Sequence, residues 1–141
     1  MIRLSLVIPC FNEGKNLPLL LERCSRIGGR KDIEIVIVDN GSTDNSEAIL
    51  NELLPSYPFV SLVHVKQNQG YGYGILEGLK SASGDILSWT HADMQADPCD
   101  AIKALKFFEN TTTPEKIFVK GRRYGRHFAD VFFTAGMSFF E

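Results

Sequence analysis

Two short runs of apolar residues constrain the fold of this chain more than any other feature. They are LSLVIP at residues 4–9 and IEIVIVD at residues 33–39, and each is apolar at nearly every position. Such runs are typical of strands that are covered on both faces. A segment with helical spacing follows each run. The sequence therefore predicts βαβ units and a mostly parallel sheet between two helical layers, a three-layer α/β/α fold.

The alternation of strand and helix continues along the rest of the chain. Gly28 and Gly29 are expected to end the first helix, and one of Ser42, Thr43 or Asp44 is expected to cap the second. Further expected elements are strands at residues 60–65, 86–92 and 116–121 and helices around residues 75–82 and 101–109. In a sheet of this kind, ligands bind beyond the carboxyl ends of the strands.

Length and composition are those of an ordinary globular protein. The chain has 141 residues, 44% hydrophobic and 23% charged, with a net charge of −2. We expect one domain over residues 1–141 and no general attraction to nucleic acid or anionic membrane. No apolar run reaches the roughly 20 residues that span a bilayer. Cys10, Cys24 and Cys99 form no metal or redox spacing, so we expect reduced thiols and a cytoplasmic protein.

Acidic residues stand where two of the expected strands end. Asp39 closes the second strand and Asp93 follows the fourth, so both are expected at the same edge of the sheet. Asp39 is placed to accept hydrogen bonds from a ribose or a base. Alternatively, it closes its own turn through a local hydrogen bond to the backbone. The motif alone favours neither role.

The segment HADMQADP, at residues 91–98, is a candidate metal site. On an extended backbone, His91, Asp93 and Gln95 would point to the same side. A hard divalent cation that carries nucleotide phosphates takes oxygen ligands and often binds through one or two carboxylates. The alternative is that His91 is a hydrogen-bonded strand residue and that Asp97 caps the next helix.

Two further loops are candidate nucleotide contacts. PCFNEG, at residues 9–14, follows the first strand but lacks the GxGxxG pattern, which argues against an NAD-dependent oxidoreductase. Asn12 and Glu13 are placed to contact a nucleotide, although capping the following helix is the simpler interpretation for Asn12. NQGYGYG, at residues 68–74, either brings backbone N–H groups close to phosphates or serves as a flexible turn.

Taken together and in order, these segments resemble family 2 glycosyltransferases of the GT-A fold. The resemblance rests on LSLVIPCFNEGKNL, IEIVIVDNGSTDNS, NQGYGYGILEGLKSASGDIL, HADMQADP and VKGRRYG, and it covers residues 4 to about 125. The pattern looks most like the branch similar to dolichyl-phosphate mannosyltransferase and bacterial polyprenyl-phosphate or lipopolysaccharide sugar transferases.

The resemblance implies inverting transfer of a sugar from a UDP- or GDP-linked donor, with Mg²⁺ or Mn²⁺ as the cofactor. The acceptor would be a polyprenyl phosphate or a glycan of the cell envelope, and the protein would lie in the cytoplasm at the inner face of the membrane. The implied nucleotide-binding residues are Pro9, Phe11, Glu13, Asp39, Gly70 and Asp93, the metal ligands are His91, Asp93 and Gln95, and the catalytic residues are Asp93 and Arg123.

The sequence departs from the family pattern in three places. His91 replaces the first aspartate of the family's DAD segment, and imidazole is a poorer ligand than carboxylate for Mg²⁺ but suits Mn²⁺ better. Tyr71 stands where many relatives have a lysine, and Arg122 replaces a serine. The acceptor half of the family has no counterpart, so we expect the chain to be truncated.

A lipid phosphate acceptor would make a general base unnecessary, because its second ionisation near pH ~6 already gives an anionic nucleophile. The basic cluster of Lys120, Arg122, Arg123 and Arg126 is then a candidate phosphate site, or else a solvated surface patch. One short cluster does not indicate nucleic-acid binding. Residues 127–141 are expected to form an apolar helix that is buried, contacts a second subunit or lies at a membrane surface.

Two hypotheses follow. The first is a glycosyltransferase catalytic domain or its donor-binding half, which predicts that a nucleotide diphosphate with manganese raises the thermal stability. The second is a non-catalytic module that binds a sugar nucleotide or a partner and has lost turnover through His91 and truncation.

Overall fold

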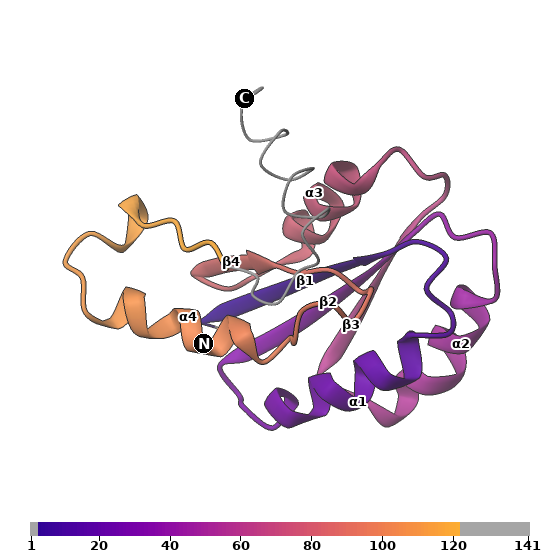
Figure 1. Cartoon of the computed structure of the whole chain (residues 1–141), viewed down its shortest axis with the longest axis horizontal. Coiled ribbons are helices and arrows are strands. Elements are labelled where there is room, and N and C mark those ends of the chain that lie inside the picture. The colour runs from indigo at the N-terminus through magenta and orange to yellow at the C-terminus, as the bar shows by residue number, and fades with distance from the viewer. Residues whose placement is uncertain (1–2, 122–141) are drawn as a thin grey trace, which may run out of the picture. The chain divides into compact units, whose positions relative to one another are not determined.

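The computed structural model describes residues 3–121, and the chain divides into two compact units between Lys106 and Phe107. Strands and helices alternate through the first unit (Figure 1). The elements are β1 (Leu4–Cys10), α1 (Leu17–Gly28), β2 (Ile33–Asn40), α2 (Ser46–Leu53), η1 (Leu54–Ser56), β3 (Val60–Val65), α3 (Tyr71–Ser81), β4 (Ile86–Trp89), α4 (Asp100–Glu109) and η2 (Pro114–Lys116). The predicted alternation is confirmed for the first four strands.

The four strands form one parallel sheet in the order β3-β2-β1-β4. Cys10 of β1 pairs with Asp39 of β2, which in turn pairs with His64 of β3. On the other side of β1, Val7 pairs with Trp89 of β4. The chain therefore builds the sheet outward from β1 to β3 and then returns to place β4 beside β1. Open α/β sheets bind their ligands at the carboxyl ends of the strands beside such a change of direction.

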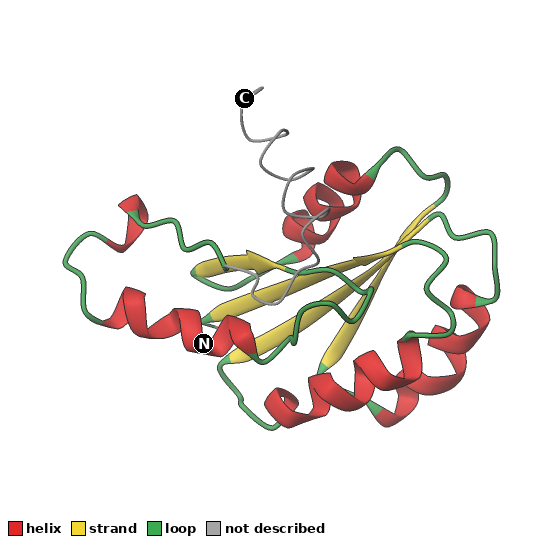
Figure 2. Cartoon of the chain, viewed as in Figure 1, coloured by secondary structure: helices red, strands yellow, loops and turns green. Residues whose placement is uncertain are grey.

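Helices cover both faces of the sheet, which gives the three layers expected (Figure 2). On one face, α1, α2 and the beginning of α4 pack against the apolar core that includes Leu6, Ile8 and Ile35. On the other face, α3 covers Val7 and Val38. Gly78 permits this close approach, because a Cβ atom at that position would overlap both valine side chains. Burial of both faces explains why β1 and β2 are apolar along nearly their whole length.

The first helix ends as predicted, but the second begins later than predicted. α1 includes Gly28, and Gly29 is its C-cap. The N-cap of α2 is Asn45, so none of the three residues named as capping candidates holds that position. Asp44 still contributes, because its Oδ1 accepts the backbone N–H of Ser46 at 2.9 Å. The side chain thus caps the helix from one position further upstream.

Two predicted strand segments are wrong. β4 ends at Trp89 rather than at residue 92, because the chain bends after Thr90 and Met94 adopts a left-handed φ of 65°. Residues 116–121 contain no strand. Pro114 begins the short 3-10 turn η2, in which the N–H of Ile117 bonds to the Pro114 carbonyl. The apolar alternation of KIFVKG is only a local pattern, and a strand also needs a neighbour for its hydrogen bonds. The helix predicted at residues 127–141 lies outside the described residues.

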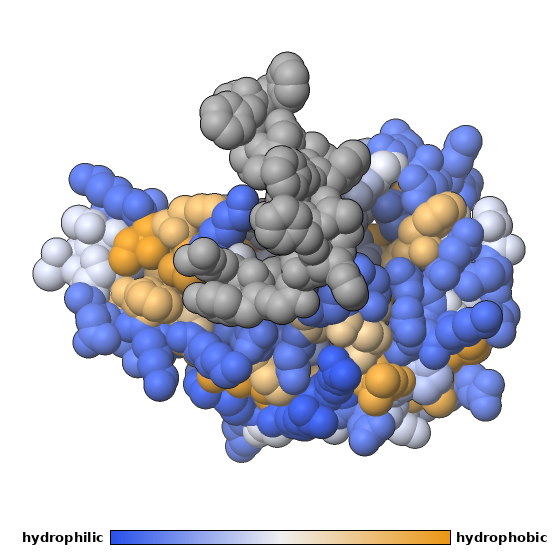
Figure 3. Space-filling view, viewed as in Figure 1, coloured by the Kyte–Doolittle hydropathy of each residue, from blue (hydrophilic) through white to orange (hydrophobic). Residues whose placement is uncertain are grey.

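On the face shown in Figure 3, apolar side chains of the described residues lie in small groups among polar ones. The largest exposed apolar side chains of the first unit are Phe11, Leu19, Tyr71, Leu76, Leu87 and Trp89. Within residues 3–121, no helix combines the length and the apolarity that crossing a membrane requires.

Candidate functional site

A cavity of about 250 Å³ opens at the carboxyl edge of the sheet. It is lined by Pro9, Cys10, Phe11, Asn40, Asn68 and Tyr71, which come from the ends of β1 and β2 and from the segment that begins α3. Phe11 and Tyr71 contribute two aromatic rings, each about two-fifths exposed. Pockets that bind small molecules have volumes from about 300 Å³ upward, so this cavity is large enough for only one part of a nucleotide.

The loops after β1 and β2 are linked by hydrogen bonds that span about 30 residues of sequence. Asn12 has a left-handed φ of 55°, a conformation that asparagine tolerates. Its Oδ1 accepts the backbone N–H groups of Thr43 at 2.7 Å and Asp44 at 3.2 Å. The Asn12 N–H donates to Ser42 Oγ at 3.1 Å. Asn12 therefore braces two loops and does not cap α1, whose N-cap is Asn16.

Asp39 lies at the end of β2 with a buried side chain. Its Oδ1 accepts the backbone N–H of Ser42 at 3.1 Å, so the local turn-closing bond that the sequence suggested is present. Its Oδ2 lies 3.6 Å from Nδ1 of His64 on the neighbouring strand. One carboxylate oxygen is thus occupied by the turn, and the other faces an exposed imidazole. Sequence reasoning missed His64 because the contact depends on the register of β2 and β3.

Asn40 is a second residue that the sequence analysis missed. Its side chain is buried and lines the cavity. Nδ2 donates to the Gly70 carbonyl at 2.9 Å, and within residues 3–121 Oδ1 accepts no hydrogen bond. Buried polar atoms are normally paired, so this oxygen marks a place where a ligand N–H could bind. The signal in the sequence was its position beside Asp39.

Cys10 forms an uncharged part of the cavity wall. Burial, aided by the carboxylates of Glu13 and Asp39, raises the pKa of its thiol well above the ordinary value. The Glu13 carboxylate accepts a hydrogen bond from Nδ2 of Asn16 at 2.6 Å, which turns it toward the first turn of α1. Gly70, the N-cap of α3, has a φ of 101° and donates its N–H to Asn68 Oδ1. A residue with a side chain would be strained there.

The segment after β4 carries the candidate metal ligands. Because Met94 is left-handed, the backbone is not extended, and the premise that placed His91, Asp93 and Gln95 on one side is wrong. Asp93 Oδ1 accepts the backbone N–H of Gln95 at 3.0 Å. His91 stacks on Tyr71 with ring centroids 4.6 Å apart. Among the described residues, no three or more His, Cys, Asp or Glu side chains form a group that could hold a metal.

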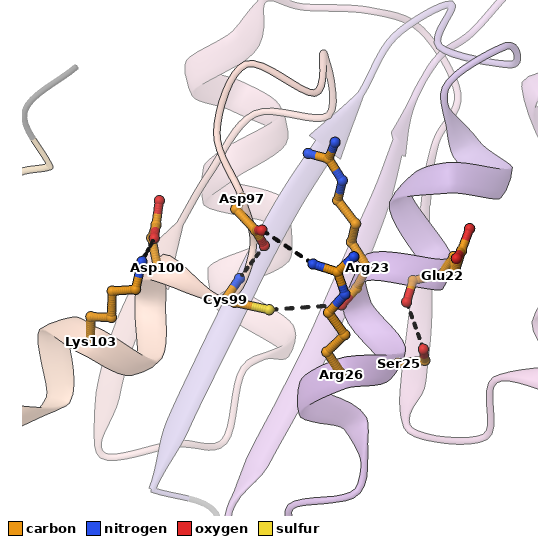
Figure 4. Close-up of polar contacts among 8 residues, drawn as sticks. All are labelled: Glu22, Arg23, Ser25, Arg26, Asp97, Cys99, Asp100 and Lys103. Atoms are coloured by element: carbon orange, nitrogen blue, oxygen red, sulfur yellow. Dashed lines mark hydrogen bonds and ion pairs between the residues drawn. The ribbon is translucent and has the colours of Figure 1, made fainter. Parts of the chain in front are cut away.

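The far end of this segment is fixed to α1 (Figure 4). Asp97 Oδ1 accepts the backbone N–H of Cys99 at 2.9 Å, and Oδ2 pairs with Arg26 at 3.6 Å. Hydrogen bonding from Cys99, chiefly from its N–H, lowers the pKa of the Asp97 carboxyl, and the Arg26 guanidinium lowers it further. Cys99 Sγ donates to the carbonyl of Arg23. The sequence suggested that Asp97 caps the next helix, but α4 begins at Asp100, and Asp97 closes the turn that precedes it.

The topology places the carboxyl ends of β2 and β4 at the same edge of the sheet, since both strands run parallel to β1, which lies between them. Asp39 lies within the end of β2, and Asp93 lies in the segment that follows β4. The aromatic stack joins the two sides, because Tyr71 lines the cavity and His91 leads into the Asp93 turn. Arg122, Arg123 and Arg126 lie outside the described residues.

Comparison of the sequence with known proteins identifies relatives among sugar transferases. The undecaprenyl-phosphate 4-deoxy-4-formamido-L-arabinose transferase of Pectobacterium carotovorum is 40% identical over 100 residues, covering 67% of this chain and 30% of that protein. The corresponding protein of Photorhabdus laumondii is 33% identical over 113 residues, covering 76% of this chain and 34% of that protein. The chain thus spans about a third of the length of these relatives.

Solved structures share the fold. A mannosyltransferase from Pyrobaculum calidifontis, in complex with GDP-Man and Mn²⁺, superposes with a TM-score of 0.63 at 25% identity, covering 78% of this chain and 33% of that chain. Glucosyl-3-phosphoglycerate synthase from Mycobacterium tuberculosis, in complex with UDP, gives 0.64 at 20% identity, covering 86% and 46%. The family model for glycosyl transferase family 2 matches residues 5–137. With that match and a parallel sheet of the GT-A type, the chain belongs to glycosyl transferase family 2.

Proposed function

We propose that this chain is the donor-binding part of an inverting glycosyltransferase that moves a sugar from a nucleotide diphosphate to a polyprenyl phosphate. The observation that carries the proposal is the cavity at the carboxyl edge of the sheet, with Asp39 next to its wall residue Asn40 in β2. The relatives named as undecaprenyl-phosphate sugar transferases support the acceptor class. Since they are transferases, they do not favour the alternative of a non-catalytic module.

The nucleoside would bind at the braced loops. Asp39 Oδ2 would accept a hydrogen bond from the ribose or base, while Oδ1 stays on the turn. Pro9 and Phe11 would provide apolar contact in the cavity, and the free Oδ1 of Asn40 would accept an N–H of the ligand. The amino end of α3 favours negative charge and would face the diphosphate. Glu13 would act mainly by holding the first loop through Asn16.

The residues after β4 fit a divalent cation that shares its ligands with a nucleotide. Mg²⁺ and Mn²⁺ in such sites bind through one or two carboxylates together with substrate phosphates, so a closed cage of protein ligands is not required. Asp93 and Gln95 would hold the cation. The family resemblance also implies His91, whose imidazole would favour Mn²⁺, but its ring stacks on Tyr71. Bound there, the cation would neutralise charge on the departing diphosphate. The neighbour with GDP-Man and Mn²⁺ supports this assignment.

The acceptor would be a polyprenyl phosphate, as in the relatives named above. A lipid phosphate is already anionic at neutral pH, so its attack needs no general base. Lys120, together with Arg122, Arg123 and Arg126, would bind the phosphate, and Arg123 would act in catalysis. The protein would lie in the cytoplasm at the inner face of the membrane, and residues 127–141 would be buried, contact a second subunit or lie at the membrane surface.

Calorimetric titration with UDP, GDP and their sugar derivatives, with and without Mn²⁺, tests the proposal. One nucleotide is expected to bind, and more tightly with the cation. Asp39→Asn keeps an oxygen for Ser42 but places an NH₂ group at the other position, so affinity should fall about tenfold or more. Asp85→Asn, before the amino end of β4, is the matched control and should have no effect. Absence of binding for every nucleotide would overturn the proposal.

A further inference from the structure

The rings of Tyr71 and His91 lie flat against each other. Tyr71 is the first residue of α3 and His91 follows β4, so the contact joins two residues that are 20 positions apart in the sequence. The ring centroids are 4.6 Å apart and the planes differ by 3°, which is a parallel stack. Both residues depart from the pattern described for the family, and here the two departures touch.

Tyr71 needs a partner to hold its ring in place. Its side chain lines the cavity but is about two-fifths exposed. Its chain neighbours Gly70 and Gly72 have no side chain that could pack on the ring. The imidazole of His91 covers one of its faces.

We propose that His91 is a positioning residue of the donor site. By stacking on Tyr71, it fixes one wall of the cavity and couples that wall to the turn that carries Asp93. The inference rests on the proposed function, since the ligand is the donor nucleotide. It assigns to His91 a role that does not require a metal. Aromatic pairs of this kind change an equilibrium by about three- to tenfold.

A role as metal ligand gives the opposite pattern of mutational effects. His91→Phe keeps a flat ring for the stack but has no atom that could bind a cation. His91→Asp supplies a carboxylate in place of the ring. Stacking predicts that the phenylalanine variant binds nucleotide well and the aspartate variant poorly, with or without metal. Ligation predicts the reverse, and only when the cation is present.

Calorimetric titration of the 141-residue chain with UDP and GDP, once with Mn²⁺ and once with EDTA, separates the two roles. His91→Ala and Tyr71→Leu should each weaken nucleotide binding by about three- to tenfold in both conditions, and the double variant should be no weaker than the poorer single variant. His91→Phe should stay within about twofold of the wild type. Tyr73→Leu, two residues further along α3 and absent from the cavity wall, is the matched control and should be neutral.

The results that would contradict either the role of His91 or the proposed function are the following. If His91→Asp binds as well as the wild type in Mn²⁺ while His91→Phe loses affinity only there, His91 is a metal ligand and the inference is wrong. Equal losses for the phenylalanine and alanine variants would also contradict stacking. If the wild type binds and the variants at both positions bind equally well, the inference alone falls. If the wild type binds neither nucleotide in either condition, the proposed function falls and the inference with it.

Discussion

Two regions at the carboxyl edge of the sheet are held in place by different forces. The loops after β1 and β2 are joined by polar contacts, with Asn12 Oδ1 accepting backbone N–H groups of Thr43 and Asp44. In the segment after β4, apolar packing holds the first part, because Ala92 is buried and Met94 packs against the same core as α1, and Asp97 pairs with Arg26 of α1 at the far end. The hydrogen bond of Asp93 in that segment is local.

The carboxyl edge of the sheet thus combines two rigidly linked loops, after β1 and β2, with a segment after β4 whose first part is held by apolar side chains. Loops that are linked by hydrogen bonds present a preformed surface, and preformed surfaces lose little entropy when a ligand binds. In the segment after β4, the apolar residues Ala92 and Met94 pack on the core and alternate with Asp93 and Gln95, the proposed ligands of the cation. Polar substitutions should therefore damage the fold in the first region and the binding of ligands in the second.

The largest effect on stability is expected for Gly41→Ala in the first region. Gly41 has a φ of 72°, and a Cβ atom there would overlap the backbone of Gln67 and Asn68. Strain and overlap together should lower the free energy of unfolding by about 3 kcal/mol. Urea denaturation measures the loss. Gly72→Ala, at a helical position with open space, is the control and should be neutral or stabilising by up to about 1 kcal/mol. Equal behaviour of the two variants would contradict the packing described for this turn.

A smaller effect tests the brace itself. Asn12→Ala removes the acceptor of two backbone N–H groups and places alanine at a left-handed φ, so the free energy of unfolding should fall by about 1 to 2 kcal/mol. Asp93→Ala removes one local bond and should change it by less than about 0.5 kcal/mol. In nucleotide titrations with Mn²⁺, Asp93→Ala should instead weaken binding. If both variants lost a similar amount of stability, the polar side chains of the two regions would contribute equally to the fold, and the contrast drawn above would be wrong.

The strands could be predicted from the sequence, whereas the turns that follow them could not. Strands such as β1 and β2 can be recognised in the sequence because burial on both faces leaves an apolar run, and parallel order then places the carboxyl ends of β2 and β4 at one edge. The left-handed turns at Asn12 and Met94 leave no comparable mark, since neither residue is glycine. These two turns decide where the neighbouring polar side chains point.

The sequence also did not predict which residues of neighbouring elements contact Asp39 and Asn40. The contact between Asp39 and His64, and the contact between Asn40 and Gly70, depend on how β2 is aligned with β3 and how closely α3 approaches. Neither register nor approach is a property of a single segment. The predicted strand at residues 116–121 failed for the related reason that its pattern was read without a partner strand.

The smallest effect concerns the ion pair that ends the second region. The pKa of Asp97 is lowered from 3.8, chiefly by the Cys99 N–H and then by Arg26, so the carboxylate stabilises the fold at neutral pH. Because a depressed pKa gives stability that is lost as the pH falls through it, Asp97→Asn should be less stable than the wild type at about pH 7 and equal to it in strong acid. Asp97 is about one-third exposed, so screening by water should keep the difference below about 0.5 kcal/mol. Urea denaturation of both proteins across this pH range measures it. A difference that persists unchanged in acid would show that Asp97 acts through its shape and not through its charge.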